Sequence, residues 1–139
     1  MKYVYIASVA LLAACRTSSG PDPSGTHTGA TPVVVRYEPR PPGVPFDAKM
    51  ASVATVAKDK DDLYKVTFGD CWATVKRPET PPKWKVVDGS ICKTNLGDVK
   101  IDGGDMTVVE EGRMSFAFEG KTADGKTKVR FEFAGGIKS

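Results

Sequence analysis

The sequence has little histidine, since His27 is the single one among 139 residues. Serine- and cysteine-based catalysis needs an imidazole near the nucleophile, so one histidine leaves little room for these mechanisms. An excess of charge of one sign is also lacking, because 20 basic and 17 acidic residues leave a net charge of only +3. A dedicated nucleic-acid binder carries a clustered basic face. We therefore expect no nucleic-acid partner.

Long apolar runs are absent beyond the N-terminus. Residues 1–14 read MKYVYIASVALLAA, with a basic residue at Lys2, then an apolar stretch and small residues. This is the layout of a secretory signal peptide. As a helix, the stretch from Tyr3 to Ala14 would extend about 18 Å, against a hydrocarbon core of about 30 Å. We therefore interpret residues 1–14 as a signal peptide and not as a membrane span.

The segment Leu12-Ala13-Ala14-Cys15 resembles the lipobox of bacterial lipoproteins. The resemblance implies cleavage before Cys15, which would then carry a diacylglycerol and an N-acyl chain such as palmitate. Two or three acyl chains anchor a protein stably, because each buried CH₂ contributes about 0.8 kcal/mol. Arg16 stands where the enterobacterial family uses aspartate for inner-membrane retention, which implies the outer membrane. The alternative is an ordinary secretory signal followed by a chance cysteine.

Residues 15–45 are predicted to be the lipidated cysteine followed by a disordered tether. In residues 16–45, 18 of 30 positions are Pro, Gly, Ser or Thr. Such a composition buries too little apolar surface to offset the entropy of ordering the chain. Val33-Val34-Val35 is the exception, and it is interpreted either as an edge strand or as an unstructured apolar segment. His27 falls in this tether, which supplies no fixed geometry for catalysis or metal binding.

Residues 46–139 are predicted to form a small all-β domain. Phe116 and Phe118 alternate with polar or small neighbours, a period of two that places successive side chains on opposite faces of a sheet. Asp-Gly and Glu-Gly pairs between the apolar runs favour tight hairpins. We expect an antiparallel up-and-down meander that forms a compact barrel or a two-sheet sandwich. The predicted strands are residues 49–57, 62–68, 70–76, 83–87, 90–94, 97–101, 105–110, 113–119 and 126–133.

The start of this domain has a second interpretation. Ala48, Ala51 and Ala54 follow a potential cap at Asp47, so residues 48–57 could begin a short helix. The β-branched residues nearby favour a strand.

Two cysteines remain in the domain once Cys15 is assigned to lipid. Cys71 and Cys92 form an even pair in an exported protein, which favours a disulfide. A thiol used for catalysis or metal binding is the alternative. The domain contains neither a histidine nor a Cys-x-x-Cys spacing, which such a catalytic or metal-binding thiol would need.

No residue is identified as catalytic, and no metal site or cofactor is expected. The domain contains no phosphate-binding glycine loop and no nucleotide fingerprint. A carboxylate-based hydrolase is the remaining enzymatic alternative, because two acids suffice for glycoside hydrolysis. Asp98, Asp102 and Asp105 surround a glycine pair but lack the alternating spacing of a calcium loop. We interpret them as acidic flanks of a turn.

Trp72 is the candidate contact residue, because inward Cys71 and Ala73 would leave its indole on the outer face of a strand. A bulge near Gly69 that reverses the buried face is the alternative. The sequence thus predicts a non-catalytic envelope lipoprotein that docks a protein partner or the envelope surface. The alternative function is a lipocalin-like carrier of a small apolar ligand, with four inward aromatic side chains lining its cavity: Phe116, Phe118, Phe131 and Phe133.

Overall fold

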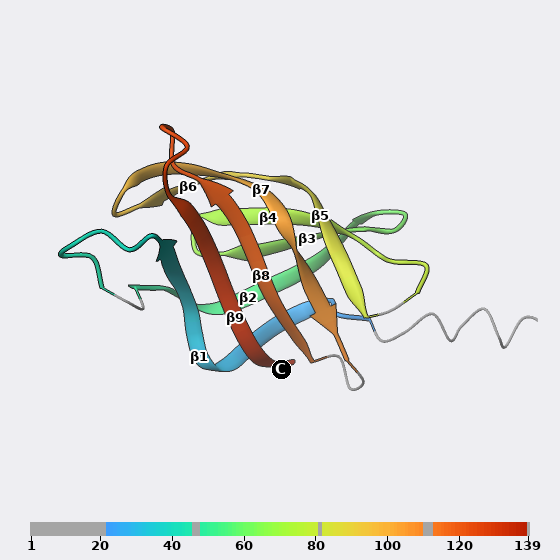
Figure 1. Cartoon of the computed structure of the whole chain (residues 1–139). Helices are drawn as coiled ribbons and strands as arrows, with labels where there is room; N and C mark the ends of the chain where they lie inside the picture. Colours follow the sequence, from blue (N-terminus) through green and yellow to red (C-terminus); the bar gives the residue numbers. More distant parts are fainter. Residues whose placement is uncertain (1–21, 46–47, 81, 110–112, 139) are drawn as a thin grey trace, which may run out of the picture.

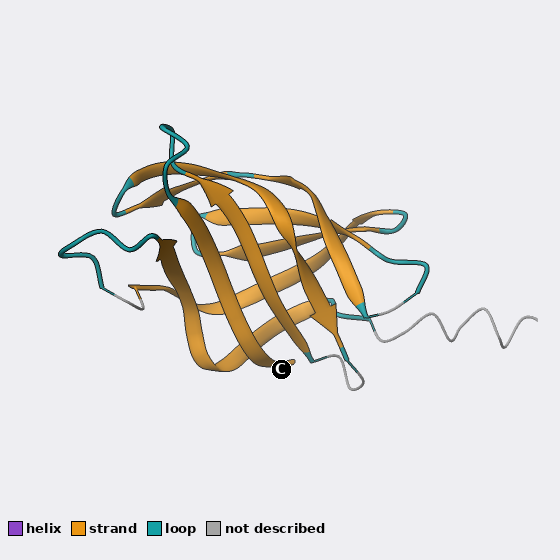
Figure 2. Ribbon diagram, in the orientation of Figure 1, coloured by secondary structure: helices purple, strands orange, loops and turns teal. Residues whose placement is uncertain are grey.

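A computed structural model of the chain describes residues 22–45, 48–80, 82–109 and 113–138. The described residues form β-strands joined by turns and loops, with no helix among them (Figure 2). The strands are β1 (Gly25–Glu38), β2 (Ala48–Lys60), β3 (Leu63–Phe68), β4 (Cys71–Lys76), β5 (Lys83–Gly89), β6 (Ile91–Thr94), β7 (Gly97–Val108), β8 (Met114–Lys121) and β9 (Lys128–Lys138).

The strands close into an antiparallel barrel, as Figure 1 shows. Each strand from β1 to β4 pairs with the next, and β1 also pairs with β9, which continues the sheet through β8 to β7. β7 closes the ring by pairing with β5 through its second half, while its first half pairs with β6. The expected all-β barrel is therefore confirmed, with eight strands in the ring and β6 beside it.

The tether prediction is wrong for Gly25–Glu38, because this segment is the barrel strand β1. β1 pairs with both β2 and β9, so it is an interior member of the sheet and not an edge. Its alternate side chains Val33, Val35 and Tyr37 are buried. Burial of these three side chains outweighs the strand-breaking composition around them. Both ladders shift register between Thr28 and Val33–Val34, where the segment contains Gly29 and Pro32.

Two further predictions are settled by the strands themselves. The segment at residues 48–57 is a strand, as part of β2, and not a helix. The two strands expected at residues 97–101 and 105–110 are one continuous strand, β7. The register of β7 against β8 shifts between Ile101 and Gly103, so a bulge absorbs the glycine pair without ending the strand.

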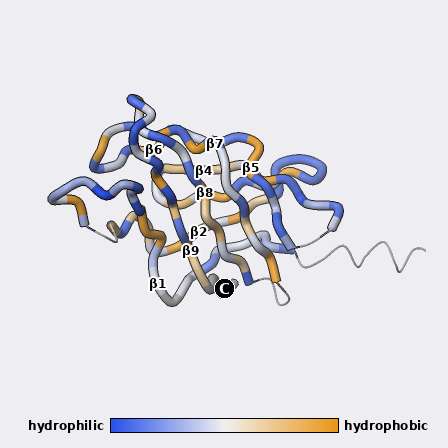
Figure 3. The backbone as a smooth tube through the Cα atoms, viewed as in Figure 1, coloured by the Kyte–Doolittle hydropathy of each residue, from blue (hydrophilic) through white to orange (hydrophobic). Residues whose placement is uncertain are grey.

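The barrel interior is apolar and strongly aromatic. Figure 3 shows hydrophilic and hydrophobic residues alternating along β9. Phe116 and Phe118 stack at 4.2 Å between ring centroids, and Phe68 lies 5.2 Å from Phe116. Tyr64 and Trp84 meet edge to face at 5.0 Å. These contacts build one core at the centre of the ring. Among the described residues, no helix is long and apolar enough to cross a membrane.

Candidate docking surface

Trp72 lies on the outer face of β4, as expected from the alternation of the strand. Its neighbours Cys71 and Ala73 are buried, whereas Trp72 is only partly buried. The ammonium of Lys65, on the neighbouring strand β3, lies 4.6 Å from the centroid of the indole ring. This cation–π contact holds the ring against the sheet and leaves part of it in contact with solvent. The alternative of a bulge that buries Trp72 is not observed, since β3 and β4 pair in continuous register.

The backbone at Trp72 is fixed from the other side by Ser90, which joins β5 to β6. The Trp72 N–H donates to the Ser90 hydroxyl at 2.8 Å, and the Ser90 N–H donates to the Trp72 carbonyl at 2.9 Å. The carbonyl of Ser90 in turn accepts a hydrogen bond from the N–H of Ile101 at 3.0 Å. The indole is therefore presented by a strand whose position is set by three hydrogen bonds.

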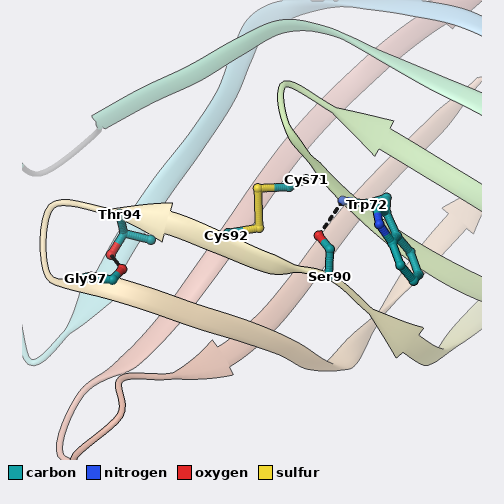
Figure 4. Close-up of a disulfide and its surroundings, with 6 residues drawn as sticks. All are labelled: Cys71, Trp72, Ser90, Cys92, Thr94 and Gly97. Carbon is teal, nitrogen blue, oxygen red and sulfur yellow. Dashed lines mark hydrogen bonds between the residues drawn. A yellow bond between two sulfur atoms is a disulfide. The ribbon is translucent and has the colours of Figure 1, made fainter.

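A disulfide links the same region to β6. Cys71 and Cys92 are bonded, with a Cα–Cα distance of 5.5 Å, and both are buried. Figure 4 shows the disulfide joining the start of β4 to β6, with Ser90 beside the backbone of Trp72. The predicted pairing is confirmed. Because Cys71 precedes Trp72 directly, the covalent link restrains the strand that carries the indole.

Ile91 adds a second apolar side chain to this surface. It follows Ser90 directly and is 60% exposed, the highest value among the large exposed apolar residues described. The sequence analysis did not single out Ile91. Its signal was present, because buried Cys92 next to it places Ile91 on the outer face of β6. We name Lys65, Trp72, Ser90 and Ile91 the Trp72 surface.

The four phenylalanines proposed as ligand lining all lie in the interior. Phe116, Phe118, Phe131 and Phe133 are each no more than 4% exposed. Their rings contact one another and Phe68, with centroid distances between 4.2 and 6.0 Å. Rings this close fill the space between them, so they behave here as packed core.

His27 is not in a tether but is fully buried in β1. Its Nε2 donates to the carbonyl of Pro23 at 2.6 Å, and its Nδ1 has no hydrogen-bond partner among the described residues. In the part of the chain that the structure describes, no three His, Cys, Asp or Glu side chains gather as metal ligands. Asp98, Asp102 and Asp105 belong to β7 and its bulge, and Asp105 pairs with Lys83 at 3.9 Å.

Cys15, the expected lipid attachment residue, lies outside the described residues, and its modification stays a prediction. Comparisons with protein-family models, with curated proteins and with solved structures find no match to this chain.

Proposed function

We propose that the chain is a lipid-anchored lipoprotein of the bacterial envelope whose β-barrel docks a protein partner through the Trp72 surface. The sequence features that support the anchor are the signal layout of residues 1–14 and the lipobox ending at Cys15. In this proposal the barrel performs no catalysis and carries no cofactor, and the outer membrane is its location.

The observation that carries the docking proposal is the way Trp72 is held. An indole that is partly exposed, stacked under Lys65 and fixed through Ser90 presents a large apolar area at little cost in conformational entropy. Tryptophan is enriched among the residues that dominate binding energy at protein interfaces. The backbone hydrogen bonds and the disulfide keep this surface preorganised for a partner.

The chemistry of the surface indicates the chemistry of the partner. Trp72 and Ile91 favour an apolar pocket or an aromatic side chain opposite them. Lys65 stands over the indole and has no ion pair among the described residues. A carboxylate on the partner would satisfy it, so we infer an interface with an apolar centre and an acidic rim.

The packing of the interior supports docking over the carrier alternative. A carrier needs space between its inward aromatic side chains, whereas Phe116 and Phe118 stack at 4.2 Å and Phe133 lies 5.5 Å from Phe116. A partner that binds the outer face needs no such space.

The docking proposal is tested by crosslinking in intact cells. A photoreactive amino acid replaces Ile91, which leaves Trp72 in place, and a matched chain carries it at Lys126 in the exposed β8–β9 turn. We expect a discrete crosslinked species from position 91 alone, and we expect Trp72→Ala to remove it without changing the folded fraction. Identical patterns from positions 91 and 126, or a species that survives Trp72→Ala, would refute docking at this surface.

The anchor is tested separately. Cells fed a labelled fatty acid should label the chain, and Cys15→Ser should abolish both the label and recovery in the outer-membrane fraction. A Cys15→Ser chain that still co-fractionates with the outer membrane would contradict lipid anchoring.

A further inference from the structure

A basic cleft lies where β4 ends and β5 begins, on the outside of the barrel. Its volume is about 540 Å³, within the range of small-molecule sites. Four cationic and two acidic side chains are among the residues that line it, so its charge is positive. The lining residues are Asp62, Lys76, Arg77, Pro78, Glu79, Thr80, Lys83, Lys85 and Val87.

Arg77 is held in a fixed position at this cleft. Its guanidinium lies 5.3 Å from the ring centroids of both Tyr64 and Trp84, and its Nη2 donates to the Tyr64 hydroxyl at 2.7 Å. Its backbone N–H donates to the carbonyl of Asp62 at 2.7 Å. The side-chain Nε–H is buried and has no hydrogen-bond partner among the described residues. This arginine is therefore preorganised. Its buried Nε–H cannot reach a ligand in the cleft, so the donors it can offer are those of its Nη atoms that Tyr64 does not use.

Two lysines of the cleft face each other across the sheet. Lys76 on β4 and Lys85 on β5 are directly paired residues, an arrangement of like charges that destabilises a sheet. Asp105 is the partner of Lys85 on β7, but its carboxylate pairs with Lys83 at 3.9 Å. Lys85 itself makes no ion pair within the described part of the chain.

The carboxylates nearby leave most of this charge available. Lys76 and Asp62 are 4.0 Å apart and both well exposed; Lys83 is also well exposed, and its partner Asp105 is less so. Exposed pairs at such distances are weak and exchange readily for a better anion. Glu79 also lines the cleft and makes no ion pair among the described residues. The four cationic side chains outnumber the two carboxylates, so the lining can attract an anion.

We propose that this cleft binds a phosphate group, on a small phosphorylated molecule or on a lipid headgroup. A phosphate monoester carries a charge of about −1.5 to −2 at neutral pH, which matches the excess of cations here. Arginine donates to two phosphate oxygens at once, and lysine contributes as a point charge. A phosphate placed between Lys76 and Lys85 would replace their repulsion with two attractions. The site is separate from the Trp72 surface and does not depend on docking there.

The test is an NMR titration of the full chain with inorganic phosphate. We expect amide shifts confined to the cleft and a dissociation constant that rises about tenfold in Lys85→Gln, the loss of one charge-assisted hydrogen bond. Lys126→Gln removes an equal charge from the β8–β9 turn and should leave the constant unchanged. Because Lys85 is exposed, its replacement should preserve the spectrum elsewhere. Shifts scattered over the surface, or equal effects of Lys85→Gln and Lys126→Gln, would overturn the proposal.

A second titration separates the two sources of phosphate. Soluble short-chain phosphatidic acid and phosphatidylcholine are added in place of inorganic phosphate. Phosphatidic acid binding more tightly than inorganic phosphate, with phosphatidylcholine inactive, would support a lipid headgroup. Equal binding of phosphatidic acid and inorganic phosphate would support a small phosphorylated molecule. Absence of all binding would overturn the site and leave the proposed docking at Trp72 untouched.

Discussion

Gly89 lies against Ile101 so closely that the glycine has no room for a side chain. A β-carbon built on Gly89 would lie 2.5 Å from the carbonyl oxygen of Ile101 and 2.6 Å from its Cβ. Gly89 is the last residue of β5, and Ser90 connects it to β6. The contact therefore lies where the pairing partner of β7 changes from β6 to β5. The closure of the barrel depends on this close approach of two backbones.

Gly89→Ala should therefore lower the free energy of unfolding by about 1–3 kcal/mol, since the backbone must shift to admit a methyl group. Gly103→Ala is the matched control, because a β-carbon there would meet only the Glu119 side chain at 3.6 Å. Urea denaturation of both variants measures the difference. Equal stability of the two would contradict the close approach.

Phe118→Ala should lower the free energy of unfolding by about 3–5 kcal/mol, because the ring is fully buried and stacked on Phe116. Phe118→Leu keeps most of the apolar volume and should cost much less. Thermal and urea unfolding give both values. A small effect of Phe118→Ala would show that the interior has free space, and it would revive the carrier function.

Removal of the disulfide should lower stability without changing the fold. The bond between Cys71 and Cys92 closes a loop with a sequence separation of 21, for which chain entropy predicts a loss of about 3 kcal/mol. The double variant Cys71→Ala, Cys92→Ala is compared with the oxidised chain by urea denaturation. A midpoint that does not move would argue that the bond contributes nothing to stability.

The same charge should destabilise the barrel to very different extents at two adjacent residues of β1. Val33 is fully buried, whereas Val34 is only partly buried on the outer face. Val33→Asp should destabilise the barrel by more than about 3 kcal/mol, because it places a carboxyl group in an apolar interior. Val34→Asp should cost far less. Two equal and small losses of stability would contradict the burial of Val33 and would favour the disordered tether predicted from the sequence.

The β8–β9 turn should show a local dependence on pH. The Thr122 hydroxyl donates to the Asp124 carboxylate at 2.6 Å and the Lys126 N–H donates to it at 3.0 Å; both bonds lower the pKa of Asp124 below its ordinary value of 3.8. A lowered pKa in the folded state stabilises the turn above pH 3.8, and this contribution is lost as the pH falls through the folded value. An NMR titration of the carboxyl group should give a midpoint below 3.8, and Asp124→Asn should remove the dependence. A midpoint at or above 3.8 would contradict the two hydrogen bonds.

The local pattern of side chains was enough to predict most of the barrel. Alternation placed Phe116 and Phe118 inward and Trp72 outward, and the structure agrees. Most of strand β1 was predicted as a tether, because Pro, Gly, Ser and Thr dominate residues 16–45, and an edge strand was considered only at Val33-Val34-Val35. The alternation of Val33, Val35 and Tyr37 was present within that segment. That this alternation marks a buried strand is shown by the pairing of β1 with β2 and with β9, the last strand of the chain.

Some features of the candidate sites could likewise be predicted from the sequence, whereas others depend on contacts between strands. The outward position of Trp72 follows from the alternation of its own strand, and the disulfide follows from the even pair of cysteines, so sequence alone could identify both. The cleft at Arg77 depends on Tyr64 and Trp84, which come from β3 and β5 and meet the arginine through the pairing of both strands with β4. No spacing in the sequence brings these three residues together.

The position of β1 changes how far the barrel can stand from a membrane. If Cys15 carries lipid, only residues 16–24 separate it from the start of the strand at Gly25. Even fully extended, a segment of this length reaches roughly 35 Å. The short linker would then keep the barrel close to the membrane leaflet that holds the lipid anchor. A partner must come within that radius, which favours one that is itself attached to the same membrane or rests on its surface.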